Sequence, residues 1–193
     1  DIQEAIASVC DGREVAPRYN IGFGKRPDVV QFPADVFALA QKGATSFHIS
    51  EERWNNPMLL KPGMSKKELD ENRIGWELIL DVDVSVWEYA QWTAFFLVEA
   101  LKFYEIQSLS VKYSGSRGFH IGVPFESFPK EVNNLHIAAL FPAGPKIIAV
   151  YLQDMIKDML AQKILEINSL TTICEKTGKK RTEILKNGTF DPF

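Results

Sequence analysis

The nine residues from Trp76 to Val84 constrain the fold of this chain more than any other segment. Apolar side chains recur there at every second position, which is the period of a β-strand with one buried face. The apolar face carries Trp76, Leu78, Leu80, Val82 and Val84. The other face carries Glu77, Ile79, Asp81 and Asp83. The pattern predicts a strand whose second face ends in two carboxylates.

A helix and two more strands are expected to follow. Ser85 and Glu88 have the spacing of a capping box, and apolar residues then recur at helical spacing as far as Tyr104, which predicts a helix of about five turns. Strands are expected over 109–114 and 118–123, joined by a glycine-bearing hairpin. A helix of this length makes the strands on either side of it parallel, and the hairpin adds an antiparallel strand. The predicted fold class is α+β, a mixed sheet in β-α-β-β order flanked by helices.

The remaining segments are expected to complete a single domain over residues 1–193. Residues 1–50 are interpreted as short helices and turns, with a helix that begins at Pro33 and a strand over 47–50. The portion over 130–186 is expected to be helical. With 46% hydrophobic residues the chain can bury a substantial core. That core is expected to include all four tryptophans, Trp54, Trp76, Trp87 and Trp92.

Composition excludes several classes of protein. No apolar stretch approaches the ~20 residues that cross a bilayer, so no membrane partner is expected. Cys10 and Cys174 are the only cysteines and form no CxxC, which argues against a disulfide framework and a structural zinc site and favours an intracellular compartment. A net charge of -3 means that phosphate contacts would need a local patch. One group of basic residues is interpreted as a solvated face, with template or triphosphate binding as the alternative: Arg13, Arg18, Lys25 and Arg26.

Asp81 and Asp83 are the first candidate site residues. Two positions apart on one strand, their carboxylates project to the same side at a separation of about 7 Å. Nucleotidyl transfer uses such acids to hold a pair of hard divalent ions. The alternative is the solvated exit of a strand. Because the flanking residues are apolar, two acids at a buried strand end would be costly without a cation, which favours a metal site.

The segment Ser114–His120 is the second candidate. It gathers hydroxyls, a guanidinium, an imidazole and two glycines within seven residues. Glycines allow backbone amides to approach a phosphate, and Arg117 can bind one bidentately. An ordinary hairpin turn with a surface histidine is the alternative. The predicted sheet, however, places five residues on one face and so indicates a joint metal and nucleotide site: Asp81, Asp83, Lys112, Ser114 and His120.

These two segments resemble the first two motifs of the catalytic (small) subunits of archaeo-eukaryotic DNA primases, which have the form DxD and then SGxRGxH. Residues 12–15, 52–57 and 140–145 also resemble that family. The resemblance implies a primase core related to the RRM-like fold, with Asp81 and Asp83 as catalytic residues that bind Mg²⁺ or Mn²⁺. It implies that Ser114, Arg117 and His120 bind the triphosphate of the incoming nucleotide. Lys112 joins them as a nucleotide-binding candidate because of its face alone.

The implied function is that of a DNA primase, a DNA-directed nucleotidyltransferase that uses nucleoside triphosphates to start and extend a primer on a single-stranded DNA template. The implied partner is a primase large subunit in a heterodimer, and the implied location is cytoplasmic and nucleoid-associated.

Two departures from the family pattern matter. Many members carry a zinc knob between the two motifs, whereas no cysteine or histidine occurs here over 85–107, so no structural zinc is predicted.

The second departure concerns a third carboxylate that the family carries on a later strand. Asp191 is the only acid near the end of the chain, and its Asp-Pro context favours a turn, so the chain is expected to be truncated before that motif. A catalytically incomplete fragment that binds a nucleotide or a partner is therefore one alternative. A repair primase-polymerase domain of the end-joining type is another. Its second motif usually has lysine where Arg117 stands, which favours the primase.

Overall fold

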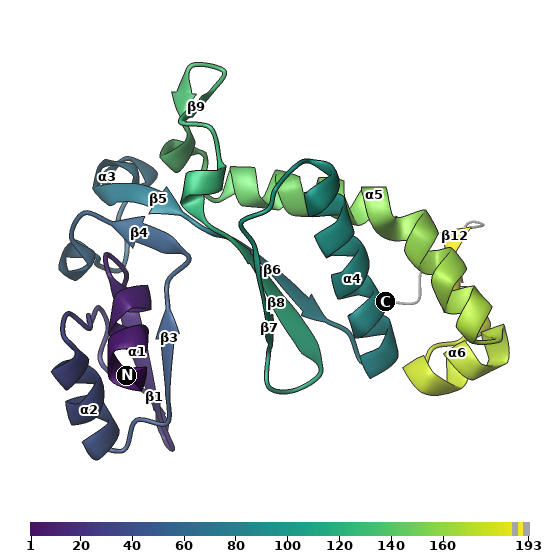
Figure 1. Cartoon of the computed structure of the whole chain (residues 1–193), viewed down its shortest axis with the longest axis horizontal. Coiled ribbons are helices and arrows are strands. Elements are labelled where there is room, and N and C mark those ends of the chain that lie inside the picture. The colour runs from purple at the N-terminus through teal and green to yellow at the C-terminus, as the bar shows by residue number, and fades with distance from the viewer. Residues whose placement is uncertain (187–188, 191–193) are drawn as a thin grey trace. The chain divides into compact units, whose positions relative to one another are not determined.

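The computed structural model describes residues 1–186 and 189–190, and it confirms the α+β class. Helices alternate with small antiparallel sheets (Figure 1). The chain divides into two compact units. The first comprises residues 1–77 and 128–141, and the second comprises residues 78–127 together with the chain from 142 onward.

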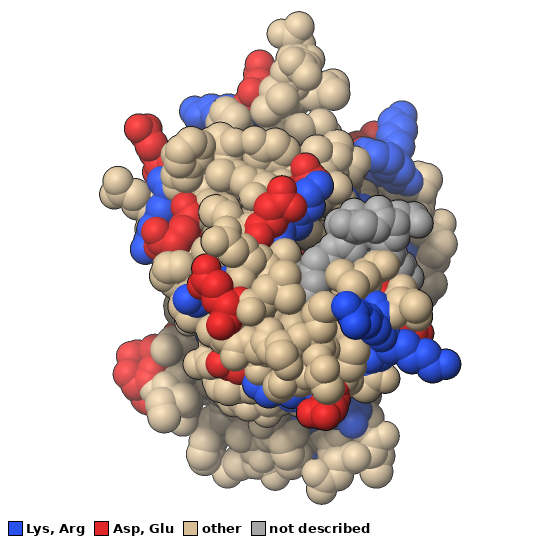
Figure 2. Space-filling view, turned by 90° about the vertical axis from the view of Figure 1, so that its right-hand side faces the viewer, with Lys and Arg blue, Asp and Glu red and all other residues tan. Residues whose placement is uncertain are grey.

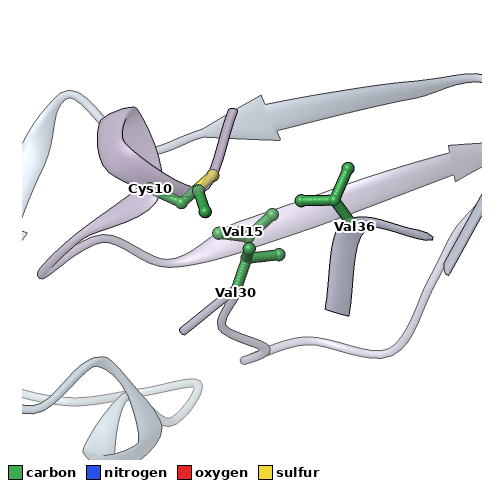
Figure 3. Close-up of a cluster of buried hydrophobic side chains, with 5 residues drawn as sticks. Cys10, Val15, Val30 and Val36 are labelled. Atoms are coloured by element: carbon green, nitrogen blue, oxygen red, sulfur yellow. The ribbon is translucent and has the colours of Figure 1, made fainter. Parts of the chain in front are cut away.

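The first unit begins with a three-stranded sheet and two helices. These are α1 (Ile2–Cys10), β1 (Val15–Tyr19), β2 (Gly22–Phe23), α2 (Pro33–Gln41) and β3 (Ser46–Ile49), with strand order β2-β1-β3. The predicted helix at Pro33 and the predicted strand near Phe47 are both present. Cys10, Val15, Val30 and Val36 pack together as a small core between these elements (Figure 3).

The rest of the first unit includes Trp76, which is fully buried. Its indole Nε1 donates a hydrogen bond of 2.9 Å to the carbonyl oxygen of Ile137. The elements are β4 (Glu52–Trp54), η1 (Pro57–Leu59), α3 (Lys66–Asn72), β5 (Arg73–Trp76), β9 (Glu131–Val132), β10 (Leu135–His136) and η3 (Ile137–Leu140). Residues 131–136 form a short hairpin because Asn133 and Asn134 adopt positive φ, so the helical portion starts later than the predicted residue 130.

Arg13 is buried in the first unit, with only 5% of its surface exposed. Its guanidinium donates to the carbonyl oxygens of Ser50 (2.7 Å) and Glu51 (3.1 Å) and forms an ion pair with Glu77. The interpretation of Arg13 as part of a solvated basic face is therefore wrong. A buried cation is retained where several acceptors compensate its lost hydration, and sequence spacing does not report such acceptors.

The second unit contains the predicted β-α-β-β sequence of elements. It comprises β6 (Leu78–Asp83), α4 (Trp87–Phe103), β7 (Ser110–Tyr113), β8 (Gly118–Val123), η2 (Phe125–Ser127), α5 (Ala143–Ile167), α6 (Leu170–Thr177), α7 (Arg181–Ile184), β11 (Leu185–Lys186) and β12 (Thr189–Phe190). Strand order is β6-β8-β7. β6 and β7 run in the same direction, as the crossover helix predicts, but β8 lies between them and pairs antiparallel with both (Figure 1).

Three details differ from the sequence-based expectations. The strand expected from Trp76 to Val84 is divided at Glu77 into β5 and β6. The backbone N–H of Glu77 donates to the carbonyl oxygen of Glu51 (2.9 Å) instead of joining the ladder between β6 and β8. The expected capping box is wrong, because α4 begins at Trp87 and its N-cap residue, Val86, has no side-chain cap. The expectation that Trp87 packs in the core is also wrong, since 44% of its surface is exposed.

Two helices of the second unit, α4 and α5, pack against its sheet. α4 turns Tyr89, Ala94, Leu97 and Leu101 inward, and α5 packs beside it through Leu152, Ile156, Leu160 and Ile164, residues that share one side of each helix. On the face that Figure 2 shows, acidic and basic side chains are interspersed among other residues. No helix within the described residues has the length and apolarity needed to span a membrane.

Candidate functional site

The two predicted clusters meet in one row across the β6-β8-β7 sheet. Asp81 of β6 lies opposite His120 of β8, and His120 in turn lies opposite Lys112 of β7. Residues directly opposite one another on antiparallel strands share a face, so these three side chains stand side by side. Asp83 lies opposite Gly118 in the next row. Ser114 follows the end of β7 and donates its backbone N–H to the carbonyl oxygen of Gly118 (3.0 Å), which brings it beside that row.

We call the surface formed by Asp81, Asp83, Lys112, Ser114 and His120 the acid face. Its acids are exposed, and the side chain of Asp81 is 65% accessible to solvent. The reasoning that these acids lie at a buried strand end is therefore wrong, because only the opposite face of β6 is buried. The Nε2 atom of His120 lies 3.5 Å from Oδ1 of Asp81, an ion pair when the imidazole is protonated.

Two glycines keep the middle strand bare on either side of His120. Gly118 and Gly122 share its face, because side chains alternate along a strand. A Cβ atom at Gly118 would lie 1.8 Å from the carbonyl oxygen of Val82, and one at Gly122 would lie 2.8 Å from Oγ of Ser110. Gly118 is thus required by the close approach of β6. The sequence pattern assigned this glycine to phosphate contact and did not predict that it makes room for the backbone of β6.

The structure does not bring Arg117 to the acid face. Arg117 follows Gly115, which has a φ of +95°, in the hairpin between β7 and β8, and it lines an open pocket of about 640 Å³. Tyr113 and Phe119 also line this pocket, and as a cross-strand pair they lie on the opposite face of the sheet from Lys112 and His120. The predicted site residues therefore fall into two groups, one on each face.

The acid face suits one particular kind of metal binding. Within the described ranges, no group of three or more His, Cys, Asp and Glu side chains is arranged to hold a metal ion. Mg²⁺, however, is usually held by one or two carboxylates together with waters and substrate phosphates. Asp81 and Asp83 supply two such oxygen ligands, so they fit an ion that arrives with a nucleotide. Asp191, considered above as a third acid, lies outside the described residues.

The residues that the sequence reasoning missed are aromatic. Trp87, Tyr113 and Phe119 gather at the hairpin end of the sheet, where Trp87 lies 5.1 Å from Phe119 and 5.4 Å from Tyr113 between ring centroids. A signal was present, because Tyr113 and Phe119 flank the hairpin on one face, but only Trp87 was assigned a place, and that place was the core. In comparisons with known proteins, no family model matches this chain, and no curated protein matches it either.

Proposed function

We propose that the acid face binds a nucleoside triphosphate with a divalent ion for nucleotidyl transfer, as in a DNA primase that starts and extends a primer on single-stranded DNA. The observation that carries this proposal is the row formed by Asp81, His120 and Lys112. It sets carboxylates on one outer strand and an ammonium group on the other, with an imidazole between them.

The dimensions of the row suit a triphosphate. β6 and β7 are each one strand away from β8, so Asp81 and Lys112 are separated by about 10 Å. Lys112 would bind phosphate oxygens at one end, with the Ser114 hydroxyl beside it, and protonated His120 would donate to an oxygen near the centre. Asp81 and Asp83 would hold Mg²⁺ or Mn²⁺, which when bound neutralises phosphate charge and favours in-line attack by a primer hydroxyl.

Other parts of the proposal rest on the family resemblance. These are the single-stranded DNA template, the large-subunit partner, the cytoplasmic nucleoid-associated location and the role of Arg117 as a triphosphate ligand. The structure supports Lys112, Ser114 and His120 as ligands more directly, because they share the face of the acids.

Nucleotide binding without turnover is the second candidate function. The observation that favours it is the small number of acids on the acid face, where Asp81 and Asp83 have no third carboxylate beside them among the residues that the structure describes. Two carboxylates can retain a nucleotide-bound ion, whereas a two-ion mechanism needs more ligands. A repair primase-polymerase of the end-joining type also carries the acid pair, so the acid face does not separate it from a primase.

The first test is calorimetric titration of the chain with a nucleoside triphosphate in the presence of Mn²⁺. We expect measurable heat for the wild type and its loss in the double variant Asp81→Asn with Asp83→Asn. The matched control is Asp154→Asn with Asp158→Asn, which removes the same charge from exposed positions on α5. Equal heats for the two double variants would contradict the acid-face assignment.

Primer synthesis on single-stranded DNA separates the two candidate functions. Labelled products from the wild type and the control variant, but none from the acid-face variant, would support a primase. Nucleotide-dependent heat without any product would support binding without turnover.

A further inference from the structure

The pocket on the other side of the sheet is a second candidate site. We call it the aromatic pocket; it is lined by Ser85, Trp87, Tyr113, Ser116, Arg117 and Phe119. Its volume of about 640 Å³ lies within the range of ~300–1,000 Å³ that is typical of ligand sites. All six residues belong to the second unit, at the start of α4 and around the β7-β8 hairpin.

Three aromatic rings line this pocket. Trp87 lies nearly parallel to Phe119, with an interplanar angle of 31°, and meets the Tyr113 ring edge-on at 89°. Despite this packing, 44% of Trp87 and 51% of Tyr113 remain exposed. The rings hold one another in place while leaving aromatic surface open, which is the property of a preformed stacking surface.

Polar groups surround the rings. The Tyr113 hydroxyl donates to the carbonyl oxygen of Ser116 (2.6 Å), which ties the hairpin to the ring cluster. Arg117 forms no ion pair with any residue that the structure describes, whereas Glu88, which follows Trp87 in the sequence, is paired with Lys176 at 3.0 Å. The rim therefore offers a cation that is free to bind an anion beside an aromatic surface.

We infer that the aromatic pocket binds an unpaired nucleotide of single-stranded DNA, with the base stacked on the ring cluster and its phosphate bound by Arg117. Aromatic rings with a neighbouring cation are the usual means of binding single strands without sequence preference. The open mouth of the pocket lets a strand enter and leave, which favours a strand over a free nucleotide. The inference rests on the single-stranded template of the proposed function and deepens it by locating the strand away from the acid face. It assigns Arg117 to the strand instead of to the triphosphate, because Arg117 lines the aromatic pocket.

Tryptophan fluorescence and the anisotropy of a fluorescein-labelled oligothymidylate test this inference together. Trp54 and Trp76 are buried and Trp92 does not line the pocket, so a stacking base quenches Trp87 selectively. We expect Trp87→Ala to abolish the quenching and to weaken binding about tenfold. Trp87→Phe should abolish the quenching but retain most of the affinity, because a ring remains. The control Trp92→Phe should change neither.

A second variant covers the case in which Trp87→Ala disturbs folding. Arg117→Gln alters an exposed hairpin residue, and we expect weaker binding with a shallower dependence on salt, since one phosphate contact is lost. The inference is overturned if Trp87→Phe keeps the quenching, or if Arg117→Gln and Trp87→Ala bind like the wild type. It is also overturned if free thymidine monophosphate or duplex DNA competes as well as the oligonucleotide does.

The acid-face variant separates this inference from the proposed function. Asp81→Asn with Asp83→Asn should bind the oligothymidylate as the wild type does. If it loses this binding, the strand lies on the acid face and the aromatic pocket is not its site. If calorimetry shows no nucleotide binding while Trp87→Ala still weakens strand binding, only the proposed function fails.

Discussion

Gly118→Ala should be the most damaging single-methyl substitution in the β6-β8-β7 sheet. The added Cβ atom would lie 1.8 Å from the carbonyl oxygen of Val82, 2.9 Å from its carbonyl carbon and 3.3 Å from Cα of Asp83. All three are backbone atoms, so no side chain can rotate away. Because such contacts essentially never fall below 3.0 Å, the two strands must separate by at least 3.0 − 1.8 = 1.2 Å at this point.

The expected cost combines two effects. Overpacking of a well-packed site costs about 1–3 kcal/mol, and the separation weakens the neighbouring ladder hydrogen bonds between β6 and β8, which adds about 1 kcal/mol. The free energy of unfolding should therefore fall by about 2–4 kcal/mol. The same separation displaces Asp83 from the acid face, so nucleotide binding in the presence of Mn²⁺ should weaken as well.

Urea unfolding followed by far-ultraviolet circular dichroism measures the change. Gly115→Ala is the matched control, because its Cβ atom would meet nothing within 4 Å and only its φ of +95° is unfavourable, at a cost of about 1 kcal/mol. The unfolding midpoint should decrease from wild type to Gly115→Ala to Gly118→Ala. If Gly118→Ala is as stable as Gly115→Ala, the close approach of β6 to Gly118 is not the reason for a glycine there.

Three further predictions follow from buried or paired groups. Arg13→Met should lower the free energy of unfolding by about 3 kcal/mol in urea, because two partly buried carbonyl oxygens lose their charged donor. Burial by itself raises the pKa of Asp70, but hydrogen bonds from Lys66 and Arg73 lower that pKa overall. The ionised Asp70 carboxylate therefore stabilises the fold at neutral pH, and this contribution is lost as the pH falls through the lowered pKa. Asp70→Asn should therefore flatten the dependence of unfolding free energy on pH below about pH 4, which urea titrations at several pH values would reveal. Burial raises the pKa of the Cys10 thiol, an effect that Arg13 partly opposes. A thiol reagent at pH 8 should therefore modify Cys174 well before the buried Cys10. Equal rates of modification would contradict the burial of Cys10.

Local periodicity was sufficient to predict the core of the second unit. Alternation along β6 and helical spacing along α4 each depend on neighbouring residues alone, so the order of strand, helix, strand and strand follows from the sequence. The hairpin then determines the register of β7 and β8. For that reason the shared face of Asp81, Lys112 and His120 was also predictable, although its metal and nucleotide remain predictions.

Only the tertiary structure decided which neighbours the other residues meet. Gly118 is required because Val82, far away in the sequence, approaches it through backbone atoms. Arg13 is buried where the carbonyl oxygens of Ser50 and Glu51 accept its hydrogen bonds, and Trp87, the first residue of α4, remains partly exposed. The sequence by itself determined the elements and the faces of the strands, since these depend on spacing. Burial, close approach and the position of Arg117 on the aromatic side depend on contacts between distant segments, which spacing does not specify.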